Sequence, residues 1–172
     1  MAWIDPPAWS ASLVTVTAFN QYIRANMQAL KTPPSGLSYV SGRDYQIAGL
    51  GAFTAVDTAL ADGAFQHTIA LAGSVAKVEF FGSLHPKVNN GQMAWNISVD
   101  GTDYFPSPGI GYSDYTGMSA NIVPVAFSFM LTGLTPGNHT FRLNWSGTHT
   151  AIKLECTGTD GSPAMFYVVE AP

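Results

Sequence analysis

The side chains that most often carry chemistry are sparse in this sequence, which has four histidines, one cysteine and eleven acidic residues. No two histidines have the spacing of metal ligands, and Cys156 has no second cysteine with which to form a zinc site. The sequence also lacks a Gly-x-Ser-x-Gly nucleophile motif and a phosphate-binding loop. Asp100 and Asp103 could contact a calcium ion, but the other ligands of a calcium loop are missing. The sequence therefore predicts no metal, no cofactor and no catalytic residues.

The low content of charged residues indicates that much of the protein surface is covered by other subunits. Charged residues make up 10% of the 172 residues, against roughly 25% in a typical soluble domain. A monomer needs a charged surface for solubility, so this deficit favours extensive contacts with other chains. The net charge of −4 and the scattered basic residues argue against nucleic acid as a partner. No apolar run reaches the length of a membrane span, so no membrane partner is expected.

Residues 17–31, TAFNQYIRANMQALK, form the one strong helix prediction. Its large apolar side chains recur at spacings of four, four and three, which places them on one helix face. Thr17 is a suitable N-cap, and Pro33 and Pro34 end the helix. Such a face needs a partner, which is either the chain's own β domain or a neighbouring subunit. The residues assigned to this face are Phe19, Tyr22, Ile23, Met27 and Leu30.

The residues before the helix read as an extended arm. Trp3, Ile4 and Trp9 are large and apolar, and two prolines between them prevent regular structure. Aromatic anchors of this kind are enriched where a chain docks into a partner. The alternative is that the arm folds back on its own domain. Together the arm and the attachment helix are assigned to residues 1–34, followed by a linker at 35–51 and a β domain at 52–172. The linker could also be the entry to the β domain, with short strands at Tyr39-Val40 and Tyr45 to Leu50.

The β domain is predicted from a period of two in hydrophobicity. One example is the run Met93 to Val99, which is followed by Asp100-Gly101, a strong hairpin signal. About eight to ten short strands with turns between them fit an antiparallel β-sandwich or jelly roll. The predicted fold is therefore mainly β, with the arm and one α-helix in front. His67 and His139 fall at inward positions of these strands, where they are most simply core or interface histidines.

Residues 106–123 interrupt this pattern and read as a long irregular loop. Long loops often carry function, and Tyr112 and Tyr115 on a Gly/Ser-rich loop suit contact with a partner or a sugar. The alternative is a loop packed between subunits. A ligand-binding surface around Tyr104, Tyr112, Tyr115 and Trp145 is thus one hypothesis for this part of the chain.

Two stretches resemble structural proteins of tailed bacteriophages. The segment Asn20 to Lys31, NQYIRANMQALK, is similar to the N-x-x-[IV]-R-x-N-x-x-x-L-K helix near the N-terminus of many such proteins. There, a tryptophan-containing arm precedes the helix and a variable β domain follows. That family often has an acidic residue where this chain has Ala25.

The second stretch, residues 52–170, resembles jelly-roll domains of the C1q and tumour-necrosis-factor type found in phage virion proteins. The matching features are Asp100-Gly101 after a Trp/Ile/Val strand, GLTPGNHTFRL at 133–143 and a terminal FYVVE at 166–170. The resemblance implies a homotrimeric, non-enzymatic virion protein. Its expected partners are copies of itself and the major capsid protein or another virion protein.

These inferences lead to three hypotheses for the function. The leading one is a capsid decoration or cement protein on the virion surface, anchored by its arm and helix. The second is a tail-fibre or receptor-binding module that recognises host surface glycans. The third is a carbohydrate-active enzyme on a sandwich, because carboxylate pairs for glycoside cleavage meet in space and leave no sequence motif.

Overall fold

The computed structural model describes residues 34–47, 51–57, 60, 62–86, 92–106, 109–114, 122–157 and 163–171, with the backbone alone at 111–114. The predicted arm and helix at 1–33 lie outside these residues. None of the described residues forms a helix, so none forms an apolar helix long enough to span a membrane. The described part is mainly β, as the sequence predicts.

The described residues form strands that are all paired antiparallel. They are β1 (Ser35–Val40), β2 (Tyr45–Gln46), β3 (Thr54–Ala55), β4 (Gln66–Leu71), β5 (Ala76–His85), β6 (Gln92–Val99), β7 (Thr102–Asp103), β8 (Ile110–Asp114), β9 (Val123–Leu131), β10 (Gly137–Gly147), β11 (Lys153–Leu154) and β12 (Ala164–Glu170).

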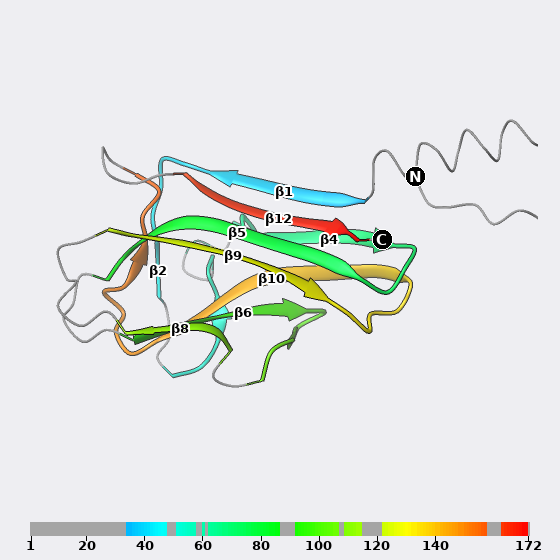
Figure 1. The fold of residues 1–172 in the computed structure, drawn as a ribbon. Helices are drawn as coiled ribbons and strands as arrows, with labels where there is room; N and C mark the ends of the chain where they lie inside the picture. The colour runs from blue at the N-terminus through cyan, green and yellow to red at the C-terminus, as the bar shows by residue number, and fades with distance from the viewer. Residues whose placement is uncertain are drawn as a thin grey trace, which may run out of the picture.

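The strands form two six-stranded sheets that lie in two layers (Figure 1). In sheet A the long strands lie in the order β1-β12-β5-β9, and β11 and β2 continue beside the end of β5. In sheet B, β10 lies between β4 and β6, with β3 also on β10 and with β7 and β8 on β6. The first and last strands are neighbours, since Ser35 pairs with Val169. Pro34, which leads to the N-terminal segment, therefore lies beside the end of the last strand.

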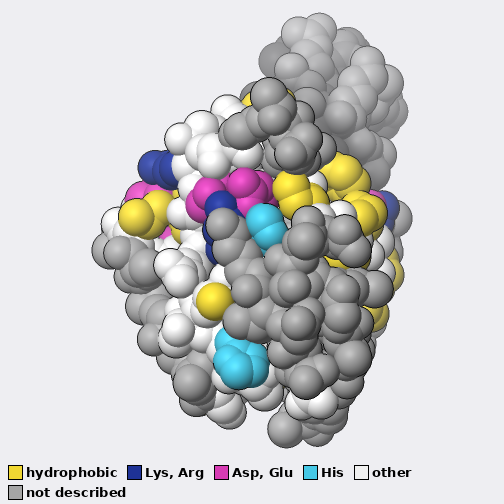
Figure 2. Space-filling view, turned by 90° about the vertical axis from the view of Figure 1, so that its left-hand side faces the viewer, with side chains coloured by type: hydrophobic (Ala, Val, Ile, Leu, Met, Phe, Trp, Pro, Cys, Tyr) yellow, Lys and Arg dark blue, Asp and Glu magenta, His cyan; other side chains and the backbone are white. Residues whose placement is uncertain are grey.

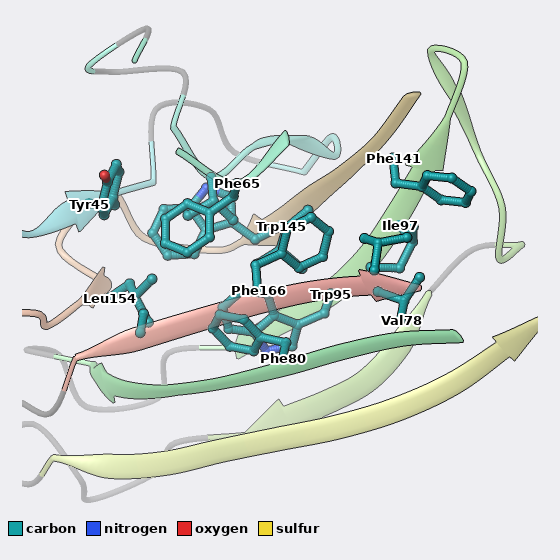
Figure 3. Packing of buried hydrophobic residues seen from close by; sticks show 14 of the residues in the cluster. Tyr45, Phe65, Val78, Phe80, Trp95, Ile97, Phe141, Trp145, Leu154 and Phe166 are labelled. Carbon is teal, nitrogen blue, oxygen red and sulfur yellow. The ribbon is translucent and has the colours of Figure 1, made fainter. Parts of the chain in front are cut away.

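The core lies between the two sheets and follows the period of two along the strands. Inward-facing Phe80 of β5 and Phe166 of β12 are buried and lie opposite Trp95 and Trp145 of sheet B (Figure 3). The ring centroid of Trp95 is 5.0 Å from that of Phe80 and 5.8 Å from that of Trp145. Each buried aromatic side chain of this size contributes on the order of 2–3 kcal/mol relative to an exposed one.

Two elements differ from the sequence predictions. The sequence predicts a linker at 35–51, whereas β1 at Ser35–Val40 pairs along its length with β12 and belongs to the β domain. It also predicts an irregular loop at 106–123, whereas Ile110–Asp114 forms β8 and pairs with β6 across an irregularity in register. Both strands are rich in glycine, serine and tyrosine, which hides the usual inward apolar pattern.

His67 of β4 explains why small residues point inward in β1. Its ring stacks on Phe166, with centroids 5.6 Å apart and an interplanar angle of 11°. Its Nε2 lies 3.2 Å from the Ser38 hydroxyl of β1. The Cβ of any larger residue at Gly36 would lie 2.4 Å from the ring carbon Cγ of His67. The histidine thus occupies the space between β1 and β4, and Leu37 and Tyr39 point the other way.

Candidate interaction surface

The chemically reactive side chains of the described residues make structural contacts. Among these residues, no group of three or more histidine, cysteine and acidic side chains could hold a metal ion. His67 packs against Phe166 and Ser38, as described above. His85 lies 3.0 Å from the Glu155 carboxylate. Cys156 is buried, and burial raises the pKa of its thiol to about 11, which disfavours the reactive thiolate.

His139 joins two turns at one end of the sandwich. Its Nε2 lies 2.7 Å from the Thr135 carbonyl and its Nδ1 lies 2.7 Å from the Asp100 carboxylate. Asp100 has a φ of 52° in its turn, and its other oxygen accepts a 2.8 Å bond from the Thr140 amide. The Thr135 carbonyl, followed by Asp100, raises the pKa of His139, because both ring nitrogens donate only in the protonated ring. The contact between His139 and Asp100 holds the hairpin turn that the Asp100-Gly101 dipeptide predicts.

A charged cluster lies at the opposite end, where β2 and β11 meet. Lys153 Nζ is 2.7 Å from both Asp44 and Glu155. Burial raises the pKa of Asp44, but hydrogen bonds from Lys153, Thr157 and the Cys156 amide outweigh it and leave the pKa lowered. Figure 2 views this end and shows acidic and basic side chains gathered beside a histidine, with hydrophobic side chains next to them. The two carboxylates of this cluster share the one ammonium group of Lys153.

The outer face of sheet A is the most unusual surface of the described part. The register places Tyr39 of β1 beside Met165 of β12, Met165 beside Phe81 of β5, and Phe81 beside Ala126 of β9. Cross-strand partners point to the same side of a sheet, so these four form an apolar row that crosses four strands. We call the surface that contains this row the apolar face. Its members are Leu37, Tyr39, Phe81, Pro124, Ala126, Met130, Met165, Tyr167 and Val169.

Several large side chains of the apolar face are open to solvent. The exposed fractions are 59% for Leu37, 70% for Tyr39, 42% for Phe81 and 51% for Met130. Four strands spaced by about 4.8 Å and six residues of about 3.4 Å give this sheet face a projected area of roughly 400 Å². That area includes the outward positions of Lys77, Glu79 and Ser128, so the apolar part is smaller. The largest apolar patch on a typical monomer is about 300–600 Å² and is often functional. The apolar face is therefore large enough to be an interaction site.

The charged residues on the apolar face are paired with one another. Lys77 and Glu79 are successive outward residues of β5, and their side chains are 2.8 Å apart. The bond from Lys77 lowers the pKa of Glu79, so the carboxylate stays ionised at neutral pH. The pair adds no net charge to the surface.

The outer face of sheet B has the opposite character. Thr68 of β4 and Thr140 of β10 lie side by side, with their hydroxyl oxygens 2.8 Å apart. Further along β10, Asn144 donates a 2.8 Å hydrogen bond to Asp103, and Arg142 donates a 2.7 Å bond to buried Asp57. Hydroxyl, amide and charged groups therefore line the outer side of β4 and β10, whereas the outward-facing Asn96 and Ser98 of β6 are buried. The two outer faces of the sandwich differ strongly in polarity.

The predicted partner-binding residues lie outside this description. Trp3, Ile4 and Trp9 of the arm, and Phe19, Tyr22, Ile23, Met27 and Leu30 of the helix, fall outside the described residues, as does Tyr115. The backbone of Tyr112 lies in β8.

The proposed ligand-binding surface is wrong for Trp145, and the hydroxyl of half-buried Tyr104 is engaged within the domain. Trp145 is fully buried, so its ring cannot meet a sugar. The Tyr104 hydroxyl donates to the Thr132 carbonyl at 2.9 Å and accepts from the Thr132 amide at 2.8 Å, while its ring packs on Phe105. The sequence carried a signal for Trp145, which alternates in phase with His139, Phe141 and Leu143 at inward positions.

The apolar face itself was not found from the sequence, although a signal for it exists. Phe81 stands at an outward position between Glu79 and Ser83, and Met165 and Tyr167 alternate with buried Phe166. Strands that are apolar on both sides are typical of strands buried on both sides. Only the register shows that these residues meet.

Comparisons with known proteins give weak structural similarity only. No protein-family model matches the chain, and no curated protein matches it. A subviral particle of infectious bursal disease virus VP2 is 10% identical over 79% of this chain and 33% of that chain, with a TM-score of 0.48. T=1 particles derived from the same virus are 10% identical over 79% of this chain and 32% of that chain, with a TM-score of 0.47. The chain thus spans about a third of these proteins, and similarity at this level assigns no family.

Proposed function

We propose that the chain is a non-enzymatic structural protein of a virus particle, and specifically a homotrimeric protein that decorates or cements the capsid. The observation that carries the proposal is the apolar face of sheet A, which lies opposite the polar outer face of sheet B. A domain with one apolar and one polar outer face is suited to assembly with other chains. The low content of charged residues supports the same conclusion.

The strand order supports a jelly roll, as the resemblance to phage virion domains implies. The eight main strands form one sheet in the order β1-β12-β5-β9 and another containing β4, β10, β6 and β8. Consecutive strands repeatedly cross from one sheet to the other, and the first strand lies beside the last, as in a double Greek key. Such a domain needs an attachment device to hold it on a particle. The N-terminal arm and helix are the candidates.

Attachment would come from burial of the arm and of the apolar helix face. Trp3, Ile4 and Trp9, followed by the helix face that begins at Phe19, would pack on the capsid protein or on neighbouring subunits. A joint between capsid subunits that is spanned by this segment cannot open without exposing the buried surface, so binding stabilises the particle. Pro34, the residue that follows this segment in the sequence, lies at the end of the sandwich where β1 begins.

The test is the copy number of the chain in purified particles relative to the major capsid protein, measured by quantitative mass spectrometry. A number comparable with that of the capsid protein supports decoration. A small fraction of it places the chain in the tail or at a vertex and overturns decoration. Absence from particles overturns the virion assignment altogether. Binding of a Trp3→Ala/Trp9→Ala variant to particles stripped of the protein tests the arm, with Thr68→Ala on the polar face as its control.

The alternative of a glycan-binding tail module has less support. Two of its four aromatic residues, Trp145 and Tyr104, are engaged within the domain. Its remaining test is a glycan array with the wild-type chain and with Tyr112→Ala and Tyr115→Ala variants. Binding that is lost in both variants would replace the decoration proposal by this one.

A further inference from the structure

We propose that the apolar face of sheet A is the contact between copies of this chain, and that the outer face of sheet B remains in solvent. This inference rests on the structural role proposed above and names the surface and the partner for it. The partner is a second copy of the same domain.

The exposed side chains of the apolar face favour a partner over water. Leu37 and Tyr39 project from β1 with most of their surface in solvent, and Phe81 and Met130 continue the face on β5 and β9. The chain has no need of these groups for its own core, which the inward-facing residues of the same strands already fill. Association would remove this apolar surface from water.

The width of the face selects a second domain over the chain's own predicted helix. Four strands at about 4.8 Å span about 19 Å. A helix with its side chains is only about 10–12 Å wide. A single helix with a narrow apolar stripe would therefore cover about half of the face. A β domain of the same size as this one covers the full width.

The charges of the face permit contact with another copy of the chain. Around a symmetry axis the equivalent charged groups of the copies approach one another, so an unpaired charge would be repelled by its equivalents or be buried without a partner. Lys77 and Glu79 avoid this problem because they pair at 2.8 Å within one strand. Lys77 and Glu79 can therefore be covered by a copy without leaving either charge unpaired.

The outer face of sheet B has none of these properties. Thr68, Thr140 and Asn144 present hydrogen-bonding groups that water satisfies equally well. This face gains little from being covered, and it supplies matched control positions.

The experiment measures the mass of the full-length chain in solution by light scattering and sedimentation. Leu37→Glu and Phe81→Glu place a charge in the contact, and Thr68→Glu places the same charge on the polar face. We expect an oligomer for the wild type and for Thr68→Glu. Leu37→Glu and Phe81→Glu should weaken association by on the order of 30-fold or more, as for a hot-spot residue. A monomeric wild type, or a face variant that keeps the wild-type mass, overturns the proposal.

Milder variants guard against misfolding. Tyr39→Ser removes the most exposed ring of the face without adding a charge, and far-ultraviolet circular dichroism checks the fold of each variant. Ile23→Glu/Met27→Glu tests the helix as the rival occupant. We expect this variant to keep the wild-type mass. Loss of the oligomer in the helix variant, with Leu37→Glu unaffected, would overturn the proposal in favour of the helix.

The outcome is separable from the proposed virion role. If the chain is monomeric but occurs in particles at the copy number of the capsid protein, the self-contact is refuted and decoration is supported. If the chain forms an oligomer that depends on Leu37 and Phe81 but is absent from particles, the self-contact is supported and the virion role is refuted.

Discussion

Replacement of Gly36 by alanine is expected to destabilise the domain through one identifiable clash. Gly36 lies in β1, and an added Cβ would be 2.4 Å from Cγ, 2.6 Å from Cβ and 2.7 Å from Nδ1 of His67. These distances are shorter than any van der Waals contact. The ring has little room to retreat, because it is stacked on Phe166 and within reach of the Ser38 hydroxyl. Burial lowers the pKa of His67, so the ring is neutral at physiological pH.

The magnitude follows from two opposing effects. Replacing a glycine by alanine at an unstrained position stabilises a protein by about 0.4–1 kcal/mol through the unfolded state. Overpacking a filled interior typically costs about 1–3 kcal/mol. The net loss at Gly36 should therefore be about 1–2 kcal/mol. Gly73 is the matched control, because its added Cβ would meet only a Glu170 carboxylate oxygen at 3.5 Å. Gly73→Ala should change the stability by less than about 0.5 kcal/mol.

A double-mutant cycle isolates the contact. Urea unfolding of the full-length chain, followed by tryptophan fluorescence at one protein concentration, gives the free energy of unfolding for each variant. His67→Ala removes the clashing ring, so Gly36→Ala should cost nothing, or even stabilise, in the His67→Ala background. The coupling energy should be about 1–3 kcal/mol. An equal loss in both backgrounds would refute the clash with His67, and an unchanged Gly36→Ala variant would refute the packing of β1 against β4.

Three further predictions concern titratable groups. Thr135 and Asp100 raise the pKa of His139 in the folded chain. Protonated His139 therefore stabilises the fold fully below the ordinary histidine pKa, and this stabilisation is lost as the pH rises through the raised pKa of the folded state. The urea midpoint of the wild type should therefore fall relative to His139→Gln between about pH 6 and pH 8, and a constant difference would contradict this. Asp44→Ala should cost about 2–3 kcal/mol in urea unfolding, because it leaves Lys153 without one of its two carboxylates, whereas exposed Asp103→Ala should cost less than about 1 kcal/mol. Cys156 should react with a thiol reagent only after unfolding, and rapid reaction of the folded chain would contradict its burial.

The core and several turns of the β domain could be predicted from the sequence because they depend on local pattern. Phe141 and Leu143 alternate with polar neighbours, and this alternation assigns them to the core in which they lie. Asp100-Gly101 predicts a tight turn, and both residues have positive φ values, 52° and 86°. In each case the residues that decide the structure lie close together in the chain.

β1 could not be recognised in the same way, because its pattern is inverted. Its small inward residues, Gly36 and Ser38, make room for His67, which lies about thirty residues away on another sheet. Leu37 and Tyr39 then point outward and imitate a core-facing pattern. A long-range contact therefore decides the strand, and local propensity gives way to it.

The apolar face also depends on contacts between strands that are distant in the sequence, so local patterns could not predict it. Tyr39, Met165, Phe81 and Ala126 come from four strands that are far apart in the sequence, and only their register places them in one row. Each residue alone is an unremarkable exposed apolar side chain, of which every protein has many. The predicted attachment residues of the arm and helix lie outside the described residues, and their role stays a prediction.

The two proposals reinforce one another through the position of β1. Leu37 and Tyr39 of the apolar face follow closely on Pro34, where the N-terminal segment joins the domain. In a closed cyclic oligomer, equivalent points lie on one ring around the axis, so contact through sheet A with the axis along the strands would hold every copy's Pro34 at the same end of the assembly. The arms would then reach a particle together, and linked binding of this kind raises avidity by roughly 10²–10⁴ over a single arm. A short apolar arm that binds weakly alone would thereby suffice to anchor the assembly, which gives a physical reason for the apolar face and the attachment segment to meet at the first strand.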